Sequence, residues 1–184
     1  MTMNRRDALK SVALMMGGTM VGATAILTGC APESQIEGLN FSAEDIAFLD
    51  EVGDTIIPST DTPGAKAVGI GSFIVMMVKD TYDAENQGSF VSGINSMRSG
   101  FKSANGKSFE EGTTEERIAY LNEMKEKADA GEDEAKVINM LKDLTILGYF
   151  TSEIGATQAL NYVEVPGRYD GCIPYEKGDK AYAI

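Results

Sequence analysis

The side chains of this sequence that could do chemistry are almost all carboxylates. The 184 residues include 28 Asp and Glu, no His, and two Cys, at positions 30 and 172. Without histidine the chain lacks Ser-His-Asp and Cys-His catalysis, imidazole metal sites and histidine-ligated haem. Two cysteines are too few for a zinc–thiolate or iron–sulfur cluster. Acid–base catalysis and hard-metal binding by carboxylates remain open.

Asp61 is the carboxylate in the most unusual setting, because it lies in the turn-rich segment 58–64. It could act as a general base or a metal ligand. An aspartate in such a segment more often accepts a local hydrogen bond that fixes the turn. The acidic run 132–134 stands where a helix is predicted to begin, and negative charge is favourable there. We therefore expect no catalytic residue, metal or cofactor in this chain, although an enzyme that uses carboxylates alone remains a weak alternative.

The charge and the first thirty residues indicate where the chain works. A formal net charge of −12 disfavours nucleic acid as a partner, because phosphates would be repelled. Arg5 and Arg6 are followed by a moderately apolar run that ends in Leu-Thr-Gly-Cys30. This pattern is typical of a twin-arginine export signal over residues 1–29, with a lipobox that places a lipid on Cys30. The alternatives are an uncleaved membrane anchor and an ordinary lipoprotein signal with a coincidental arginine pair.

The predicted location follows from this reading. We expect the mature chain on the periplasmic side of the bacterial envelope, attached by lipid to the inner or the outer membrane. The twin-arginine route carries folded proteins. A chain without cofactor ligands has one good reason to use it, namely a partner that carries a cofactor and travels with it.

Apolar periodicity predicts an all-α fold, a compact bundle of about five helices. Residues 30–40 read as a tether and 41–184 as the domain. Ser42 with Asp45 and Thr113 with Glu116 form capping boxes, Phe41 and Ile46 a hydrophobic staple, and the apolar segment 70–78 is expected at the centre. The residues expected to face the core are Ile46, Leu49, Val52, Ile56, Phe90, Ile94, Met97, Phe101, Ile118, Leu121, Met124, Val137, Leu141, Leu144 and Leu147.

Residues 161–184 form a different kind of segment. They are rich in Gly, Pro and Tyr and have no helical stripe, so an extended, irregular C-terminal arm is predicted. The tyrosines either contact another protein or fold back on the bundle.

Three segments resemble a known family. They are 56–65 (IIPSTDTPGA) with the following 67–69, then 148–152 (GYFTS), and 165–172 (VPGRYDGC). In order and spacing these are similar to the small subunit, called subunit 3 or gamma, of gluconate 2-dehydrogenase-type complexes. The resemblance covers nearly all of residues 30–184.

The resemblance implies a helical, non-catalytic subunit. Its partner would be a large flavoprotein of the glucose-methanol-choline (GMC) type, which holds FAD, oxidises a sugar, sugar acid or polyol, and leaves the cell with the small subunit. Electrons would pass to a cytochrome c subunit or to quinone. A lipobox is not general in the family and suggests that here the small subunit also anchors the complex. The expected partner interface comprises Asp61, Pro63, Gly64, Tyr149, Phe150, Pro166, Gly167, Tyr169 and Cys172.

Cys172 leaves two readings open. In an oxidising compartment it would either form a disulfide with another subunit or be a buried thiol. The alternative for the whole protein is a free-standing extracytoplasmic lipoprotein that binds a ligand or another protein.

Overall fold

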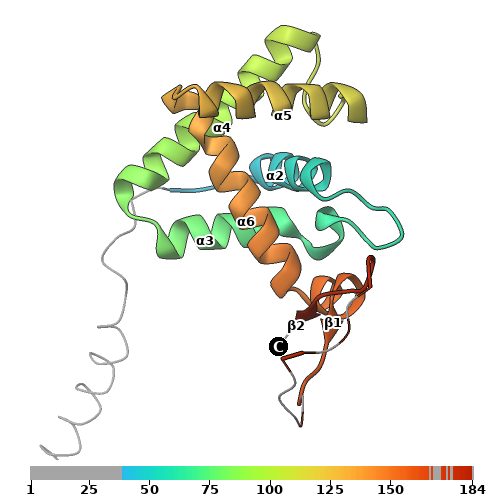
Figure 1. Ribbon diagram of the computed structural model, residues 1–184. Coiled ribbons are helices and arrows are strands. Elements are labelled where there is room, and N and C mark those ends of the chain that lie inside the picture. Colours follow the sequence, from blue (N-terminus) through green and yellow to red (C-terminus); the bar gives the residue numbers. More distant parts are fainter. Residues whose placement is uncertain (1–38, 166, 168–170, 173, 175, 184) are drawn as a thin grey trace, which may run out of the picture. The chain divides into compact units, whose positions relative to one another are not determined.

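The computed structural model describes residues 39–165, 167, 171–172, 174 and 176–183. The predicted signal 1–29 and most of the tether lie outside these residues. The described chain contains five α-helices, α2 (Ala43–Ile56), α3 (Ile70–Thr81), α4 (Ala84–Asn105), α5 (Thr114–Asp129) and α6 (Val137–Thr151). Shorter elements are η1 (Ala65–Val68), η2 (Asp133–Lys136), η3 (Gly155–Ala159), β1 (Asn161–Tyr162) and β2 (Tyr182–Ala183). The predicted all-α fold is confirmed (Figure 1).

Both predicted capping boxes are present. At the start of α2 the Ser42 hydroxyl accepts from the backbone N–H of Asp45, and the Asp45 carboxylate accepts from the backbone N–H of Ser42. Thr113 and Glu116 make the same pair at the start of α5. These bonds satisfy N–H groups that a helix start leaves without partners, which is why the helices begin here. Phe41 lies just before α2 and packs its ring edge-on against Phe90 of α4, with centroids 6.1 Å apart.

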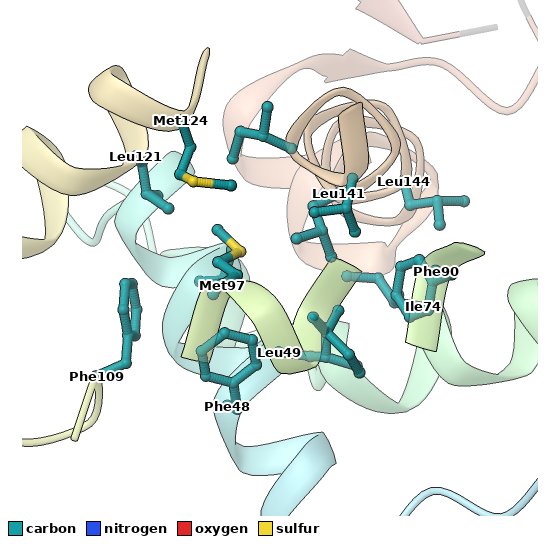
Figure 2. Close-up of a cluster of buried hydrophobic side chains, with 14 of the residues drawn as sticks. Phe48, Leu49, Ile74, Phe90, Met97, Phe109, Leu121, Met124, Leu141 and Leu144 are labelled. Carbon is teal, nitrogen blue, oxygen red and sulfur yellow. The ribbon is translucent and has the colours of Figure 1, made fainter. Parts of the chain in front are cut away.

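Helix α6 takes the central place in the bundle. It contacts α2, α3, α4 and α5 and crosses the view diagonally (Figure 1). Its Leu141 and Leu144 lie in the core near side chains from the other four helices (Figure 2). The expectation that 70–78 would be central is therefore only half right, because α3 buries Ile70, Ile74 and Val78 but exposes Met76.

Two residues of the predicted core stripes are exposed, and two more, Ile46 and Ile56, are only partly buried. Ile118 of α5 is 44% exposed and Leu147 of α6 is 45% exposed. Leu147 lies beside Leu144 at the edge of the buried face of α6, where the neighbouring elements leave it partly open to water. Ile118 lies one turn before Leu121 in α5, and only the later apolar residues of this stripe, Leu121 and Met124, are buried.

The connection into α6 and the arm differ in detail from the sequence expectation. The helix predicted from residue 132 starts as the 3-10 turn η2 and becomes α-helical at Val137, as is frequent at helix starts. After η3, β1 pairs in parallel with β2, with Asn161 opposite Tyr182 and Tyr162 opposite Ala183. The two described ends of the arm are thus joined.

Candidate functional site

A closed loop connects α2 to η1 and contains the first segment of the family resemblance. Ala65 donates from its backbone N–H to the Ile57 carbonyl at 2.9 Å, and Gly64 donates to the Ser59 hydroxyl oxygen at 2.8 Å. From α6, the hydroxyl of Tyr149 donates to the Pro63 carbonyl at 2.7 Å. The ring of Tyr149 is 1% exposed. Two segments far apart in the sequence therefore meet through one partly buried hydrogen bond.

Gly64 is required by the way this loop folds. A Cβ at this position would lie 2.6 Å from both the Ser59 backbone nitrogen and an Asp54 carboxylate oxygen. Real Cβ atoms do not approach backbone so closely, so any side chain would open the loop. The glycine serves the loop's internal packing, and the residue itself is buried.

Asp61 lies exposed at the tip of the same loop. The hydroxyl of Thr60 donates to its carboxylate at 2.9 Å, and this hydrogen bond is the main cause of a lowered pKa of Asp61. The positive charge of Lys180, in the arm, lowers the pKa further. The contacts favour the turn-fixing reading over the metal-ligand reading. Within the described residues, no three Cys, Asp or Glu side chains lie close enough to hold a metal ion.

The other predicted interface residues divide between this loop and the arm. Phe150 is 38% exposed and packs its ring edge-on against Tyr149, at 5.2 Å between centroids. Gly167 and Cys172 are exposed in the arm, whereas Pro166 and Tyr169 lie outside the described residues. Because Gly64 and Tyr149 are buried, they can affect a partner only by fixing the loop. Asp61 and Phe150 are exposed to solvent, and Pro63 is partly exposed.

An apolar groove of about 520 Å³ was not anticipated from the sequence. The last turn of α2, the exposed side of α5 and one side of α6 supply its lining, and these three helices contact one another in pairs. The lining residues are Thr55, Ile56, Ile57, Ile118, Leu121, Asn122, Lys125, Ile138, Lys142, Ile146 and Phe150. Phe150 thus belongs both to the predicted interface and to this groove.

Three large apolar side chains of the groove stay open to water. Ile118, Ile146 and Phe150 are 44%, 39% and 38% exposed. Leu121 and Ile138, at 7% and 4% exposed, belong to the core, so the groove lies directly on the core. The sequence held one signal for it: α6 carries apolar residues on more sides than an amphipathic surface helix needs.

The charged residues that line the groove are both lysines. Lys125 forms an ion pair with Asp129, one turn further along α5. Lys142 of α6 is exposed and has no ion pair with any described carboxylate. Although the chain has a net charge of −12, the charged side chains that line the groove are thus both positive.

A partly buried ionic network fixes α2 against α5 next to the groove. Glu51 of α2 accepts from Lys66 of η1 and, at 2.5 Å, from Arg117 of α5. Arg117 also donates to the backbone carbonyls of Phe109 and Glu110 at 2.8 and 2.6 Å. Burial alone would raise the pKa of Glu51, but the Lys66 hydrogen bond and the Arg117 charge outweigh it and hold that pKa low.

Comparison with known proteins gives one family. A family model described as gluconate 2-dehydrogenase subunit 3 matches residues 43–167, from the first turn of α2 into the arm. The chain belongs to this family. The resemblance drawn from the sequence is thereby confirmed, and the matched span includes both the loop and the groove. No curated protein and no solved structure gave a significant match.

Membership of the gluconate 2-dehydrogenase subunit 3 family makes a partner dehydrogenase subunit the first candidate for the groove. Among the described residues, no helix has the length and apolar character needed to span a bilayer.

Proposed function

We propose that this chain is a non-catalytic small subunit that binds and escorts an FAD-dependent, GMC-type dehydrogenase acting on a sugar, sugar acid or polyol. The observation that carries the proposal is the apolar groove on a member of a dehydrogenase-subunit family. Ile118, Ile146 and Phe150 keep more than a third of their surface exposed around it. Exposed apolar patches of this kind mark interaction sites, because leaving them in water costs free energy that a partner recovers.

Export and anchoring are parts of the same proposal. Arg5 and Arg6 direct the folded pair to the twin-arginine pathway, and the lipid on Cys30 holds it on the periplasmic side of the envelope. An intersubunit disulfide at Cys172 would strengthen the complex, and the exposure of Cys172 is compatible with one. Electrons from the flavin would leave through a cytochrome c subunit or quinone.

The test is a pull-down from gently solubilised membranes with a tag on the C-terminus. We expect a stoichiometric flavoprotein, recognised by its flavin absorbance and subunit mass, with dye-linked sugar oxidation in the same fraction. A chain that comes down alone, without flavin and stable by itself, would overturn the proposal.

A second function has one observation in its favour. The groove volume of about 520 Å³ falls in the range of small-molecule sites, so a free-standing lipoprotein that binds an apolar ligand is the alternative. Extraction of the purified chain with organic solvent, followed by mass spectrometry, distinguishes the two. A stoichiometric small molecule would favour the alternative, and a flavoprotein partner the first proposal.

A further inference from the structure

We propose that the groove between α2, α5 and α6 binds an apolar segment of the partner dehydrogenase subunit that also carries a carboxylate, and that Lys142 pairs with this carboxylate. The identity of the partner rests on the proposed function. The chemistry of the segment rests on the groove itself, as its shape, its apolar lining and its charge each constrain what can bind.

The groove is long enough for several side chains of a bound segment. On α6 the lining residues recur every four positions, at Ile138, Lys142, Ile146 and Phe150, and so follow one ridge of the helix. At 1.5 Å per residue this ridge extends about 18 Å. A bound segment therefore meets apolar contacts along the ridge, with Lys142 between two isoleucines.

The depth of the groove provides a place for an apolar anchor. Leu121 and Ile138 are nearly fully buried and form its inner surface, whereas Ile118 and Ile146 are partly exposed beside them. A large apolar side chain that contacts both pairs would be removed from water on most sides. Such enclosed positions supply most of the free energy of protein–protein binding.

The charge of the groove selects for a carboxylate. Asp129 already compensates Lys125, but no described carboxylate pairs with Lys142. A partner carboxylate next to Lys142 would form an ion pair partly shielded from water by the surrounding isoleucines, where it is stronger than on an open surface. A second copy of this chain is disfavoured as the occupant, because two molecules of net charge −12 repel each other.

The experiment uses the full chain co-expressed with its partner subunit and measures the partner recovered per tagged chain. Lys142→Glu and Ile146→Glu place a negative charge in the groove, and we expect each to reduce recovery about tenfold or more, equivalent to at least 1.4 kcal/mol. Two controls carry the same changes outside the groove. Met76→Glu is at a position 50% exposed on α3, and Lys102→Glu is at an exposed position on α4. Both should recover the partner normally.

A carbodiimide cross-link tests the ion pair directly, because this reagent joins an amine only to a carboxylate in contact with it. We expect an amide between Lys142 and an acidic residue of the partner, identified by mass spectrometry. Lys142→Arg keeps the charge, so it should retain the partner but lose the cross-link. Retention of the partner by this variant would also show that a substitution at position 142 does not by itself unfold the chain.

The outcomes separate the two proposals. If the wild-type chain and every variant recover the partner equally, the groove proposal is wrong and the escort function stands. If the wild-type chain recovers no flavoprotein, the proposed function is wrong, and so is the proposal that a segment of the dehydrogenase subunit binds in the groove. A Lys142 cross-link to a second copy of this chain would overturn the proposal, because it would show that the groove binds another copy of the same chain.

Discussion

At the scale of single residues, Tyr149 shows how one side chain joins segments that the sequence separates. Its hydroxyl reaches the loop, where it donates to the Pro63 carbonyl. The rest of the ring belongs to the core. The effect of the hydroxyl can therefore be measured apart from the effect of the ring.

Tyr149→Phe should lower the free energy of unfolding by about 1 kcal/mol, because the Pro63 carbonyl loses its hydrogen bond while the packing is kept. Urea denaturation of the purified chain measures this. Tyr162→Phe is the matched control, since Tyr162 is 51% exposed in β1 and its change should have little effect. Equal stability of all three proteins would show that the hydroxyl bond contributes nothing net.

Cys172→Ser tests the proposed intersubunit disulfide. In non-reducing denaturing electrophoresis, we expect the wild-type chain to migrate with its partner and the variant to migrate alone. Adding a reductant to the wild-type complex should reproduce the variant's pattern. If the chain still migrates with its partner after both the substitution and the addition of reductant, no disulfide at Cys172 joins the two subunits.

At this scale, the sequence predicted the helix caps more accurately than it predicted which side chains are exposed. Ser42, Asp45, Thr113 and Glu116 were assigned correctly because a capping box is local and its partners lie three residues apart. Ile118 was placed wrongly, since whether a residue on the apolar face is covered depends on where neighbouring helices end. Periodicity gives the direction of a side chain but not what lies opposite to it.

At the scale of elements, α2 and α3 approach each other closely at two glycines. A Cβ on Gly71 of α3 would lie 2.3 Å from the Ile46 carbonyl oxygen of α2, and a Cβ on Gly53 of α2 would lie 2.4 Å from Ile70. The Gly71 backbone N–H also donates to the Asp50 carboxylate at 2.7 Å. The two helices are therefore in contact at backbone level, which leaves little freedom for either to shift.

Gly71→Ala should destabilise the chain by about 1–3 kcal/mol, because the carbonyl it meets belongs to a helix backbone and cannot move aside. Gly88→Ala on α4 is the matched control, as nothing lies within 4 Å of its Cβ. That change should stabilise the chain by about 0.5–1 kcal/mol, because alanine is the better helix former. Thermal unfolding of both variants measures these effects. We expect the midpoint temperature to fall for Gly71→Ala and to rise for Gly88→Ala.

The Glu51 network gives an expectation for pH. Since the folded-state pKa of Glu51 lies below its ordinary value of 4.5, the ionised network stabilises the fold fully above that value. This contribution is lost as the pH falls through the lowered pKa. Glu51→Gln should cost about 1.5–3 kcal/mol at neutral pH and much less in acid. Unfolding curves of both proteins from neutral to acid pH test this expectation. A difference in the free energy of unfolding that stays constant at all pH values would contradict the role of the Glu51 charge.

The order and number of the helices could be predicted from the sequence, whereas their packing could not. The stripes of Phe90, Ile94, Met97 and Phe101 are long, regular and buried as expected. The groove depends on three helices that meet at angles which no local pattern encodes. Of the predicted interface, the Pro63–Tyr149 contact joins two of the segments that carry the family resemblance, which lie far apart in the sequence.

At the scale of the whole molecule, the predicted export signal and the proposed binding surface lie in different parts of the chain. The export pattern lies in residues 1–29, and the groove lies in the matched domain more than twenty residues later. If the escort proposal holds, the export signal of this chain determines where the partner is found.

Replacing Arg5 and Arg6 together by lysine should remove both this chain and the flavoprotein from the periplasm, because the twin-arginine route would no longer accept the folded pair. Cell fractionation followed by a dehydrogenase assay of each fraction measures the effect. Lys10→Arg is the control and should leave both proteins exported. Periplasmic flavoprotein that is unaffected by the double change would show that it has an export route of its own.

The pairing of β1 with β2 has a consequence for how the molecule could change over evolution. It brings Asn161 next to Tyr182, so the segment between them is closed at its base. The entropy of closing such a segment grows only with the logarithm of its length, and each doubling costs about 0.6 kcal/mol. Insertions and deletions there would barely affect the helices. The arm can therefore vary in length to suit different partners while the bundle stays the same.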